Sequence, residues 1–276
     1  MFLSKYHNKI ISLRDDLALI LSSNTFANIS NLSTPFFVTV THGSLHIVKI
    51  CLNLIPSEFD VVLILNGLRN WEIEWTKKNL RFNAMVNIYK LGNRLISHGK
   101  ILNFIFDHYS KPFGILDYDC FIFNPLLFSM ICSLEDNSLL NAFFLNPKGI
   151  FDIPQTYFLY FNTPVINQIR EKYNIGCDEI TFPNLSKKVK YAIEPIGINE
   201  NQYPDNRDFF DTLHLIVTLG ISEGYYCNFI KRLKGKPTIL SDIFHVGGIT
   251  FRSKNQVMSY NEFWKIKRVY FWYIRF

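Results

Sequence analysis

The sequence has no uninterrupted apolar run long enough to cross a membrane. The most apolar window, residues 113–132, contains two aspartates, and the N-terminal stretch is broken by Lys9, Arg14, Asp15 and Asp16. This stretch also lacks a small-residue cleavage site. We therefore expect neither a transmembrane helix nor a signal peptide.

Cysteine is also scarce. The five cysteines form no CxxC pair, and their number is odd. Such a scattered set argues against both a zinc ribbon and a disulfide framework. Unpaired thiols are typical of proteins in a reducing compartment, so we expect a cytoplasmic protein.

The chain has only a small excess of positive charge. The chain has 29 Lys and Arg against 23 Asp and Glu, which gives a formal net charge of +6. This balance is compatible with anionic ligands or an anionic membrane surface, but it is too weak to indicate nucleic-acid binding. Apolar residues are abundant at 48%, so a chain of 276 residues can bury a sizeable core.

Strand-like and helix-like segments alternate in the first half of the chain. The strand-like runs are 35–43, 60–67, 85–92 and 112–119, and the helix-like segments between them are 44–55, 70–82 and 97–109. Four such units in succession predict an α/β fold, an αβα sandwich with a mostly parallel central sheet. After residue 135 the pattern becomes mixed, with expected strands at 139–145 and 156–161 and expected helices at 164–173 and 209–220. This part predicts a smaller mixed C-terminal portion of the same sheet.

Asp117 and Asp119 flank Tyr118 at the end of the fourth strand-like run. In an extended strand, alternate side chains point to the same side, so the two carboxylates would lie together. A divalent cation would relieve their repulsion, which predicts a site for Mg²⁺ or Mn²⁺ that in turn holds a diphosphate. The alternative is an acidic loop at the start of a helix.

The chain resembles glycosyltransferases of the GT-A fold in several segments. ILDYDCFIFNP (115–125) resembles their apolar strand with its DxD motif, FFVTVTHGS (36–44) their first strand and turn, and VVLILNG (61–67) their second strand. LGNRLISHGKILNFIFDHY (91–109) resembles the segment that leads to the DxD motif, and DIFHVGGITFR (242–252) resembles a late segment that supplies a histidine to the metal. This resemblance implies a metal-dependent enzyme that uses a nucleotide-sugar, with UDP as the expected nucleotide.

The resemblance also implies roles for individual residues. The metal ligands would be Asp117, Asp119 and His245. The residues expected to bind the nucleotide-sugar, besides Asp117, are Thr41, His42, Asn66, Arg94, His98 and Lys100. Two alternatives stay open: His245 would be a hydrogen-bonded core histidine, and the segment 98–100 would be an ordinary helix start. Asn66 departs from the family, where many members have Asp at this place.

A carboxylate base is needed if the reaction inverts the anomeric centre. Asp211 and Asp208 are the candidates, with Asp205 behind them. The alternative for Asp208 is the N-cap of the helix expected at 209–220.

The resemblance completes the expected domain organisation. Residues 1–33 form an N-terminal helix and loop, 34–135 the nucleotide-binding half, 136–255 the acceptor-side half of the same domain, and 256–276 a tail rich in aromatic and basic residues. This tail would bind an anionic membrane surface or pack on the domain. The sequence gives no indication of the oligomeric state.

Glycosyl transfer to a glycan or lipid-linked acceptor, in bacterial surface polysaccharide synthesis, is therefore the predicted function. Two rivals remain. One is a nucleotidyltransferase of related fold, which the lack of a Gly-rich basic loop after the first strand disfavours. The other is a non-catalytic scaffold at the membrane that keeps the fold. The protein would lie in the cytoplasm or on the inner face of the membrane.

Overall fold

The computed structural model describes residues 2–89, 91, 95–145, 150–205, 207–234 and 242–246. A seven-stranded sheet has the order β3-β2-β1-β4-β7-β6-β8. Its strands are β1 (Pro35–Thr41), β2 (Asp60–Asn66), β3 (Ala84–Asn87), β4 (Phe113–Leu116), β6 (Ser138–Leu145), β7 (Phe158–Phe161) and β8 (Tyr226–Lys234). Strands β5 (Cys120–Ile122) and β9 (Ile243–His245) form a separate antiparallel pair.

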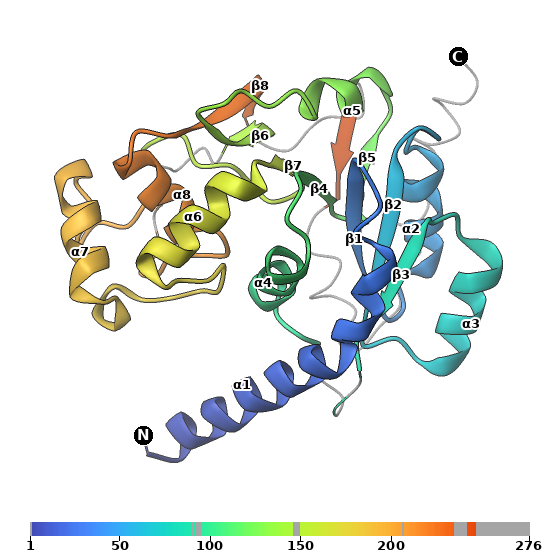
Figure 1. Ribbon diagram of the computed structural model, residues 1–276, viewed down its shortest axis with the longest axis horizontal. Helices are drawn as coiled ribbons and strands as arrows, with labels where there is room; N and C mark the ends of the chain where they lie inside the picture. The colour runs from blue at the N-terminus through green and yellow to red at the C-terminus, as the bar shows by residue number, and fades with distance from the viewer. Residues whose placement is uncertain are drawn as a thin grey trace.

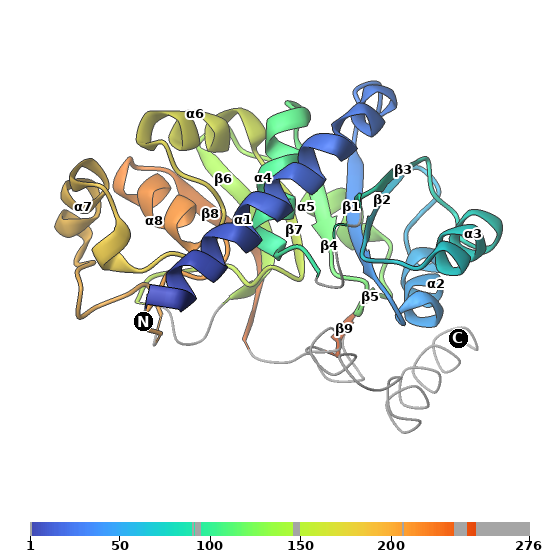
Figure 2. The ribbon, with the colours of Figure 1, turned by 90° about the horizontal axis from the view of Figure 1, so that it is seen from below.

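Helices cover both faces of the sheet. They are α1 (Phe2–Ser22), α2 (Leu45–Asn53), α3 (Asn70–Asn79), α4 (His98–His108), α5 (Leu126–Ile131), α6 (Thr163–Tyr173), α7 (Lys187–Ile193) and α8 (His214–Ser222), with short 3₁₀ turns at Ser23–Asn28, Phe182–Asn184 and Glu194–Ile196. Figures 1 and 2 show α2 and α3 beside β1–β3 at one end of the molecule and α6–α8 beside β6 and β8 at the other.

The alternation of side chains along the strands divides the core into two layers. Phe37 packs in one layer with residues from α1, α4, α6, α7 and α8, while its neighbour Phe36 packs in the other with residues from α2 and α5. This arrangement follows from the two-residue period of a strand whose faces are both covered. The α/β class, the mostly parallel sheet and the mixed C-terminal portion predicted from the sequence are therefore confirmed.

The order in which the chain adds strands to the sheet reverses at β1, with β2 and β3 on one side of it and β4 on the other. β1 pairs in parallel with both β2 and β4, and β2 and β3 continue the sheet on one side only. Beyond β4 the sheet becomes mixed, because β7 is antiparallel to β4 and β6 while β8 is parallel to β6. In α/β sheets, ligands bind at the carboxyl ends of strands at such a reversal.

Two predicted boundaries are wrong in a way that matters for the site. The fourth strand ends at Leu116, so Asp117 and Asp119 lie in a turn closed by a 2.8 Å hydrogen bond from the Cys120 N–H to the Asp117 carbonyl, not in an extended strand. The last helix begins at His214 and not near residue 209, so Asp208 is not its N-cap.

Among the described residues, no helix has the length and apolar character that a membrane span requires. The tail at 256–276 and the segment 247–255 lie outside the described residues.

Candidate active site

Asp117, Asp119 and His245 meet at the carboxyl end of β4. One ligand atom from each lies within 4.8 Å of the other two, and the Nε2 atom of His245 is 3.3 Å from an oxygen of Asp119. Asp119 and His245 are buried, at 6% and 5% exposure. Two carboxylates and one imidazole are a donor set that suits Mn²⁺ or Mg²⁺, so the three residues fit the group that the sequence predicted for them.

Backbone hydrogen bonds fix this cluster from two sides. His245 is opposite Cys120 in the β5–β9 pair, and the N–H of Val246 donates to the Asp119 carbonyl over 3.1 Å. The N–H of Asp117 donates to the Tyr157 carbonyl over 2.8 Å. The turn and the late strand are therefore held together by the fold itself, although they are far apart in the sequence.

The ring of Tyr157 stacks on His245, with 3.5 Å between the ring centroids and 28° between the planes. The sequence analysis missed this residue, because a tyrosine shortly before an ordinary strand carries no recognisable signal. Burial, followed by the fields of Asp117 and Asp119, raises the pKa of the Tyr157 hydroxyl, while Arg207 lowers it. Tyr157 therefore borders the acidic cluster and lies within the electrostatic reach of Arg207.

The cluster is electrostatically unfavourable as it stands. Burial, with a further contribution from the charge of Asp119, raises the pKa of Asp117 well above its usual range. Burial and the same two carboxylates raise the pKa of the Cys51 thiol, whose sulfur lies 3.5 Å from the Cys120 carbonyl oxygen. Two acids held this close therefore favour a bound cation or proton.

The end of β1 adjoins this acidic turn. Thr41 is buried, and its hydroxyl lies 3.3 Å from that of Tyr118, so the ends of β1 and β4 are in direct contact. His42 follows and is half-buried. The N–H of Gly43 donates to Glu72, a buried carboxylate that also accepts from the Arg69 N–H. This contact fixes the loop after β1, where the resemblance predicts that Thr41 and His42 bind the nucleotide-sugar.

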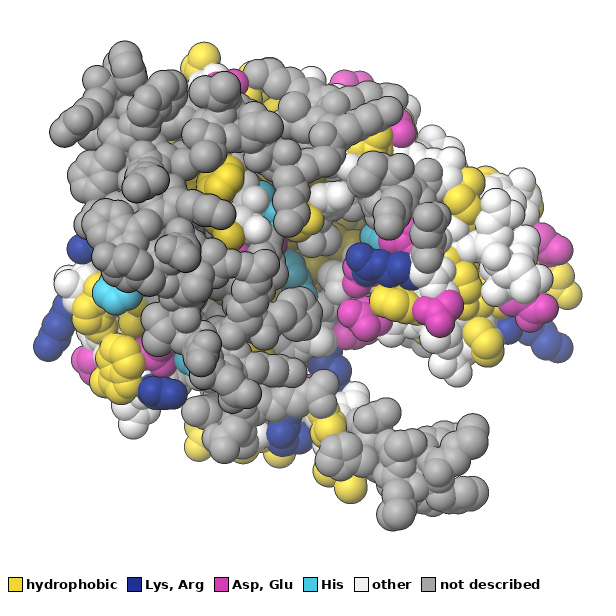
Figure 3. Space-filling model, turned by 180° about the vertical axis from the view of Figure 1, so that it is seen from behind, with side chains coloured by type: hydrophobic (Ala, Val, Ile, Leu, Met, Phe, Trp, Pro, Cys, Tyr) yellow, Lys and Arg dark blue, Asp and Glu magenta, His cyan; other side chains and the backbone are white. Residues whose placement is uncertain are grey.

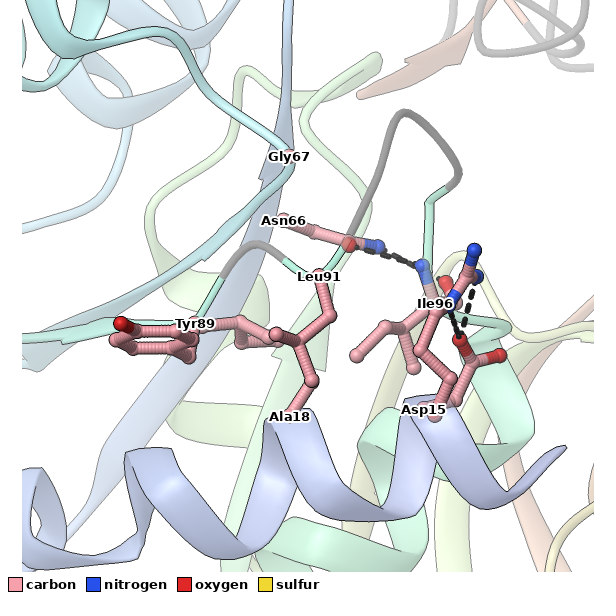
Figure 4. Close-up of a pocket in the computed structure, with 9 residues that line it drawn as sticks. Asp15, Ala18, Asn66, Gly67, Tyr89, Leu91 and Ile96 are labelled. Atoms are coloured by element: carbon pink, nitrogen blue, oxygen red, sulfur yellow. Dashed lines mark hydrogen bonds and ion pairs between the residues drawn. The ribbon is translucent and has the colours of Figure 1, made fainter. Parts of the chain in front are cut away.

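Asn66 lies at the end of β2, but its side chain serves the protein backbone. Its amide group donates to the Ile96 carbonyl over 2.9 Å and accepts from the Ile96 N–H over 3.0 Å. Figure 4 shows this pair above α1, next to a small pocket that Asp15, Ala18 and Tyr89 also line. Asn66 thus fixes the chain before α4, and its contact with a nucleobase stays a prediction.

The start of α4 is an ordinary capped helix. Ser97 accepts a hydrogen bond from the Lys100 N–H, and the Lys100 amine binds Ser12 and Asp16 of α1. Burial lowers the pKa of the His98 imidazole to about 4, against a smaller opposing effect of Asp211. His98 is therefore neutral at pH 7, and Lys100 is engaged by α1. Arg94 lies outside the described residues.

The segment before α8 carries the two candidate bases. Asp211 forms an ion pair with Arg207 and accepts a 2.8 Å hydrogen bond from the Thr212 N–H, whereas Asp208 is exposed. Asp205 is buried and accepts a hydrogen bond from the Arg207 N–H. Figure 3 shows histidine, acidic and basic side chains gathered near the centre of the rear face. Of the two candidates, Asp211 is the one whose position is fixed.

The family described as "StrH glycosyltransferase N-terminal domain" matches residues 19–166, more than half of the chain. The chain belongs to this family. The matched range includes the ends of β1, β2 and β4, and with them Thr41, Asn66 and the turn that contains Asp117 and Asp119. The StrH-family match thus covers the nucleotide-binding half expected from the sequence, while His245 lies beyond it.

Two solved structures of the glycosyltransferase GlyE from Streptococcus pneumoniae TIGR4 are similar to this StrH-family domain. The apo form has 14% identity and a TM-score of 0.37, and the match covers 52% of this chain and 38% of GlyE. The second structure has 13% identity and a TM-score of 0.35, with coverage of 57% and 41%. This chain therefore spans less than half the length of the GlyE chains. A comparison with curated proteins gives no match.

Proposed function

We propose that this StrH-family domain transfers a sugar from a nucleotide-sugar to a glycan or lipid-linked acceptor in a reaction that depends on a divalent metal. The observation that carries the proposal is the convergence of Asp117, Asp119 and His245 within 4.8 Å of one another at the reversal point of the sheet. Membership of a glycosyltransferase family supports the same activity. A GT-A type of site with a working DxD motif is part of this proposal.

Asp117, Asp119 and His245 would hold Mn²⁺ or Mg²⁺. When bound there, such an ion would neutralise the charge that develops on the leaving diphosphate. Folding brings two carboxylates together against their mutual repulsion, and binding of a cation at this site would relieve that repulsion. Tyr157 packs on the His245 ring and keeps its orientation fixed.

The nucleoside would lie over the end of β1. Thr41 and His42 are at this strand end, next to Tyr118 of the acidic turn. A nucleoside in this place would bring its diphosphate next to the metal that the carboxylates would hold. UDP is the nucleotide that we propose. The contacts of Asn66, His98 and Arg94 with the donor remain predictions, and Lys100 would have to leave Asp16 to take part.

The acceptor would approach from the side of the segment 205–211. Asp211 is our candidate for the base that takes the proton of the acceptor hydroxyl, because Arg207 and the Thr212 N–H fix its orientation. The charge of Asp211 acts on His98 of α4, and that of Arg207 acts on Tyr157, which stacks on His245. Asp208 on the exposed loop is the matched control. The substitution Asp211→Asn should lower turnover by about 10²-fold or more, and Asp208→Asn should leave it unchanged.

The direct test is a product assay. The purified protein is incubated with a panel of nucleotide-sugars, with Mn²⁺ or with EDTA, and released nucleoside diphosphate is measured by chromatography. We expect release of UDP from at least one UDP-sugar, and loss of release in EDTA. A protein that neither binds nor cleaves any nucleotide-sugar in the presence of Mn²⁺ would contradict the proposal. Its place in assembly of a bacterial surface polysaccharide, on the cytoplasmic side, is the context that this chemistry suits.

A further inference from the structure

Helix α1 carries a concentrated stripe of exposed large apolar side chains. Ile10, Leu13, Leu17, Ile20 and Leu21 are 65%, 60%, 49%, 67% and 50% exposed. Isolated exposed leucines are normal on a protein surface, but a contiguous apolar patch on one helix marks a place of interaction. Five of the large apolar side chains that are exposed in the described part of the chain thus lie on a single helix.

The stripe is on the side of α1 that faces away from the domain. Asp15, Ala18, Leu19 and Ser22 are buried against the domain, and the exposed residues follow the opposite side of the helix. Figures 1 and 2 show α1 on the outside of the molecule, where it crosses α4. The helix is therefore held on one side by its own domain and has a second apolar side for another occupant.

The spacing of the stripe is that of a helix-pairing seam. Ile10, Leu13, Leu17 and Ile20 are three, four and three residues apart, and the same spacing continues in the sequence at Leu3 and Tyr6. Three-four spacing is the pattern of a seam between two packed helices, and Leu21 lies beside the last residue of this seam. Helices that lie on a lipid surface instead have a broad apolar face bordered by basic residues.

The charges beside the stripe also disfavour a lipid surface. Arg14 pairs with Asp15 over 2.7 Å, and Asp16 pairs with Lys100 of α4, so these described charges are balanced within the molecule. A groove of about 730 Å³ runs along the flank of the stripe between α1 and α4. Its lining carries three carboxylates, from Asp16, Asp107 and Asp178, and two cations, Lys100 and Arg170, which pair with Asp16 and Asp107. The groove therefore offers no excess of positive charge that would attract an anionic membrane.

The size of the surface matches a dimer contact. A helix of 21 residues is about 30 Å long. Half of the side surface of such a helix, at a diameter of about 10 Å, is roughly 500 Å², and with the groove beside it this surface is on the order of the 800 Å² per partner that a standard protein interface buries. The stripe and the groove beside it share Ile20 and so form one continuous surface of this kind.

We propose that α1 is a dimerisation helix, and that the occupant of the stripe is α1 of a second copy of this chain. The two helices pack their stripes against each other across a two-fold axis, which makes the contact self-complementary. The dimer joins two domains through the side of α1 that faces away from its own domain.

The test is the mass of the full chain in solution, measured by size-exclusion chromatography with light scattering. We expect twice the monomer mass of 32.4 kDa. The double variant Leu13→Glu/Leu17→Glu should be monomeric with an unchanged circular dichroism spectrum, and its melting temperature should no longer depend on protein concentration. Leu126→Glu is the matched control, because Leu126 is a 67% exposed leucine on α5, and it should stay dimeric.

A milder variant covers the case in which the double charge prevents folding. Leu17→Asn should raise the dissociation constant of the dimer by at least about tenfold in sedimentation velocity. A wild-type chain that is monomeric at its highest soluble concentration would overturn the proposal, as would a folded Leu13→Glu/Leu17→Glu variant that remains dimeric. Co-sedimentation of a monomeric wild type with phosphatidylglycerol vesicles, lost in the double variant, would assign the stripe to lipid instead.

Discussion

The substitution Asp119→Asn should raise the stability of the metal-free protein and abolish its stabilisation by Mn²⁺. Asn has nearly the same shape as Asp, and its side chain can still hydrogen-bond to His245, which is 3.3 Å away. The change removes one negative charge from a buried pair and also removes one of the three proposed ligands. We therefore expect a metal-free variant that is more stable than the wild type and that gains nothing from Mn²⁺.

The magnitude follows from the geometry of the pair. Two full charges at 4.8 Å, the upper limit of the separation within the cluster, repel by about 3.5 kcal/mol at an effective dielectric constant of about 20. Asp117 avoids part of this cost by binding a proton, since burial and Asp119 raise its pKa. Asp119→Asn should therefore raise the free energy of unfolding of the metal-free protein by about 1–3 kcal/mol, equivalent to a rise of several degrees in melting temperature. In the wild type, Mn²⁺ at about 100 times its dissociation constant adds about 2.7 kcal/mol.

Thermal unfolding at pH 8, with EDTA and then with increasing Mn²⁺, measures both effects. The wild type should begin lower and rise with Mn²⁺, while Asp119→Asn should begin higher and stay level. Asp136→Asn, an exposed acid elsewhere, is the control that should behave like the wild type. If Asp119→Asn still rises with Mn²⁺ as the wild type does, Asp119 is not a ligand. If the metal-free variant is less stable, the repulsion argument fails.

Three further predictions concern the surroundings of the site. Tyr157→Ala should weaken Mn²⁺ affinity by roughly tenfold in a calorimetric titration, whereas Tyr157→Phe should retain it. The reason is that the aromatic ring, and not the hydroxyl, packs on His245 and orients its imidazole. His98 has a pKa of about 4 in the folded protein against 6.5 in the unfolded chain, so between these pH values only the unfolded state binds this proton. The free energy of unfolding should therefore fall by up to about 1.4 kcal/mol per pH unit from pH 6.5 to 4. In denaturant titrations, His98→Gln should not show this contribution of His98 to the fall. Gly114→Ala should cost about 1–3 kcal/mol in the same titrations, since a Cβ there would overlap the buried ring of Phe36, and an unchanged midpoint would show that the core can adjust.

The sheet was predictable because its strands are buried on both faces. Such strands are continuous apolar runs, as in Pro35–Thr41 and Asp60–Asn66, and the polar residues that follow them mark the strand ends. The sequence pattern predicts that the helix at His214–Ser222 begins at residue 209, several residues before its actual start. The apolar residues before His214 extend the pattern, but in the structure they have other partners. Phe210 pairs with Ile180 through the backbone, and Leu213 has a left-handed conformation with φ 69°.

Within the acidic cluster, only His245 needed the resemblance to a family to be predicted from the sequence. Asp117 and Asp119 identify themselves by their position after a strand, but nothing local connects them to His245, which the β5–β9 pairing brings beside them. The engagement of Lys100 with Asp16 depends on where α1 crosses α4, and the stacking of Tyr157 depends on the loop before β7. Tertiary placement of this kind has no periodic signal in the sequence.

Calorimetric titration of UDP into the full chain, once with Mn²⁺ and once with EDTA, tests the central claim most directly. If Asp117, Asp119 and His245 hold the metal that binds the diphosphate, UDP should bind in Mn²⁺ with an affinity at least about tenfold higher than in EDTA, a difference of about 1.4 kcal/mol. Equal binding in both conditions, or no binding in either, would contradict the assignment of this cluster as a metal-dependent nucleotide-sugar site.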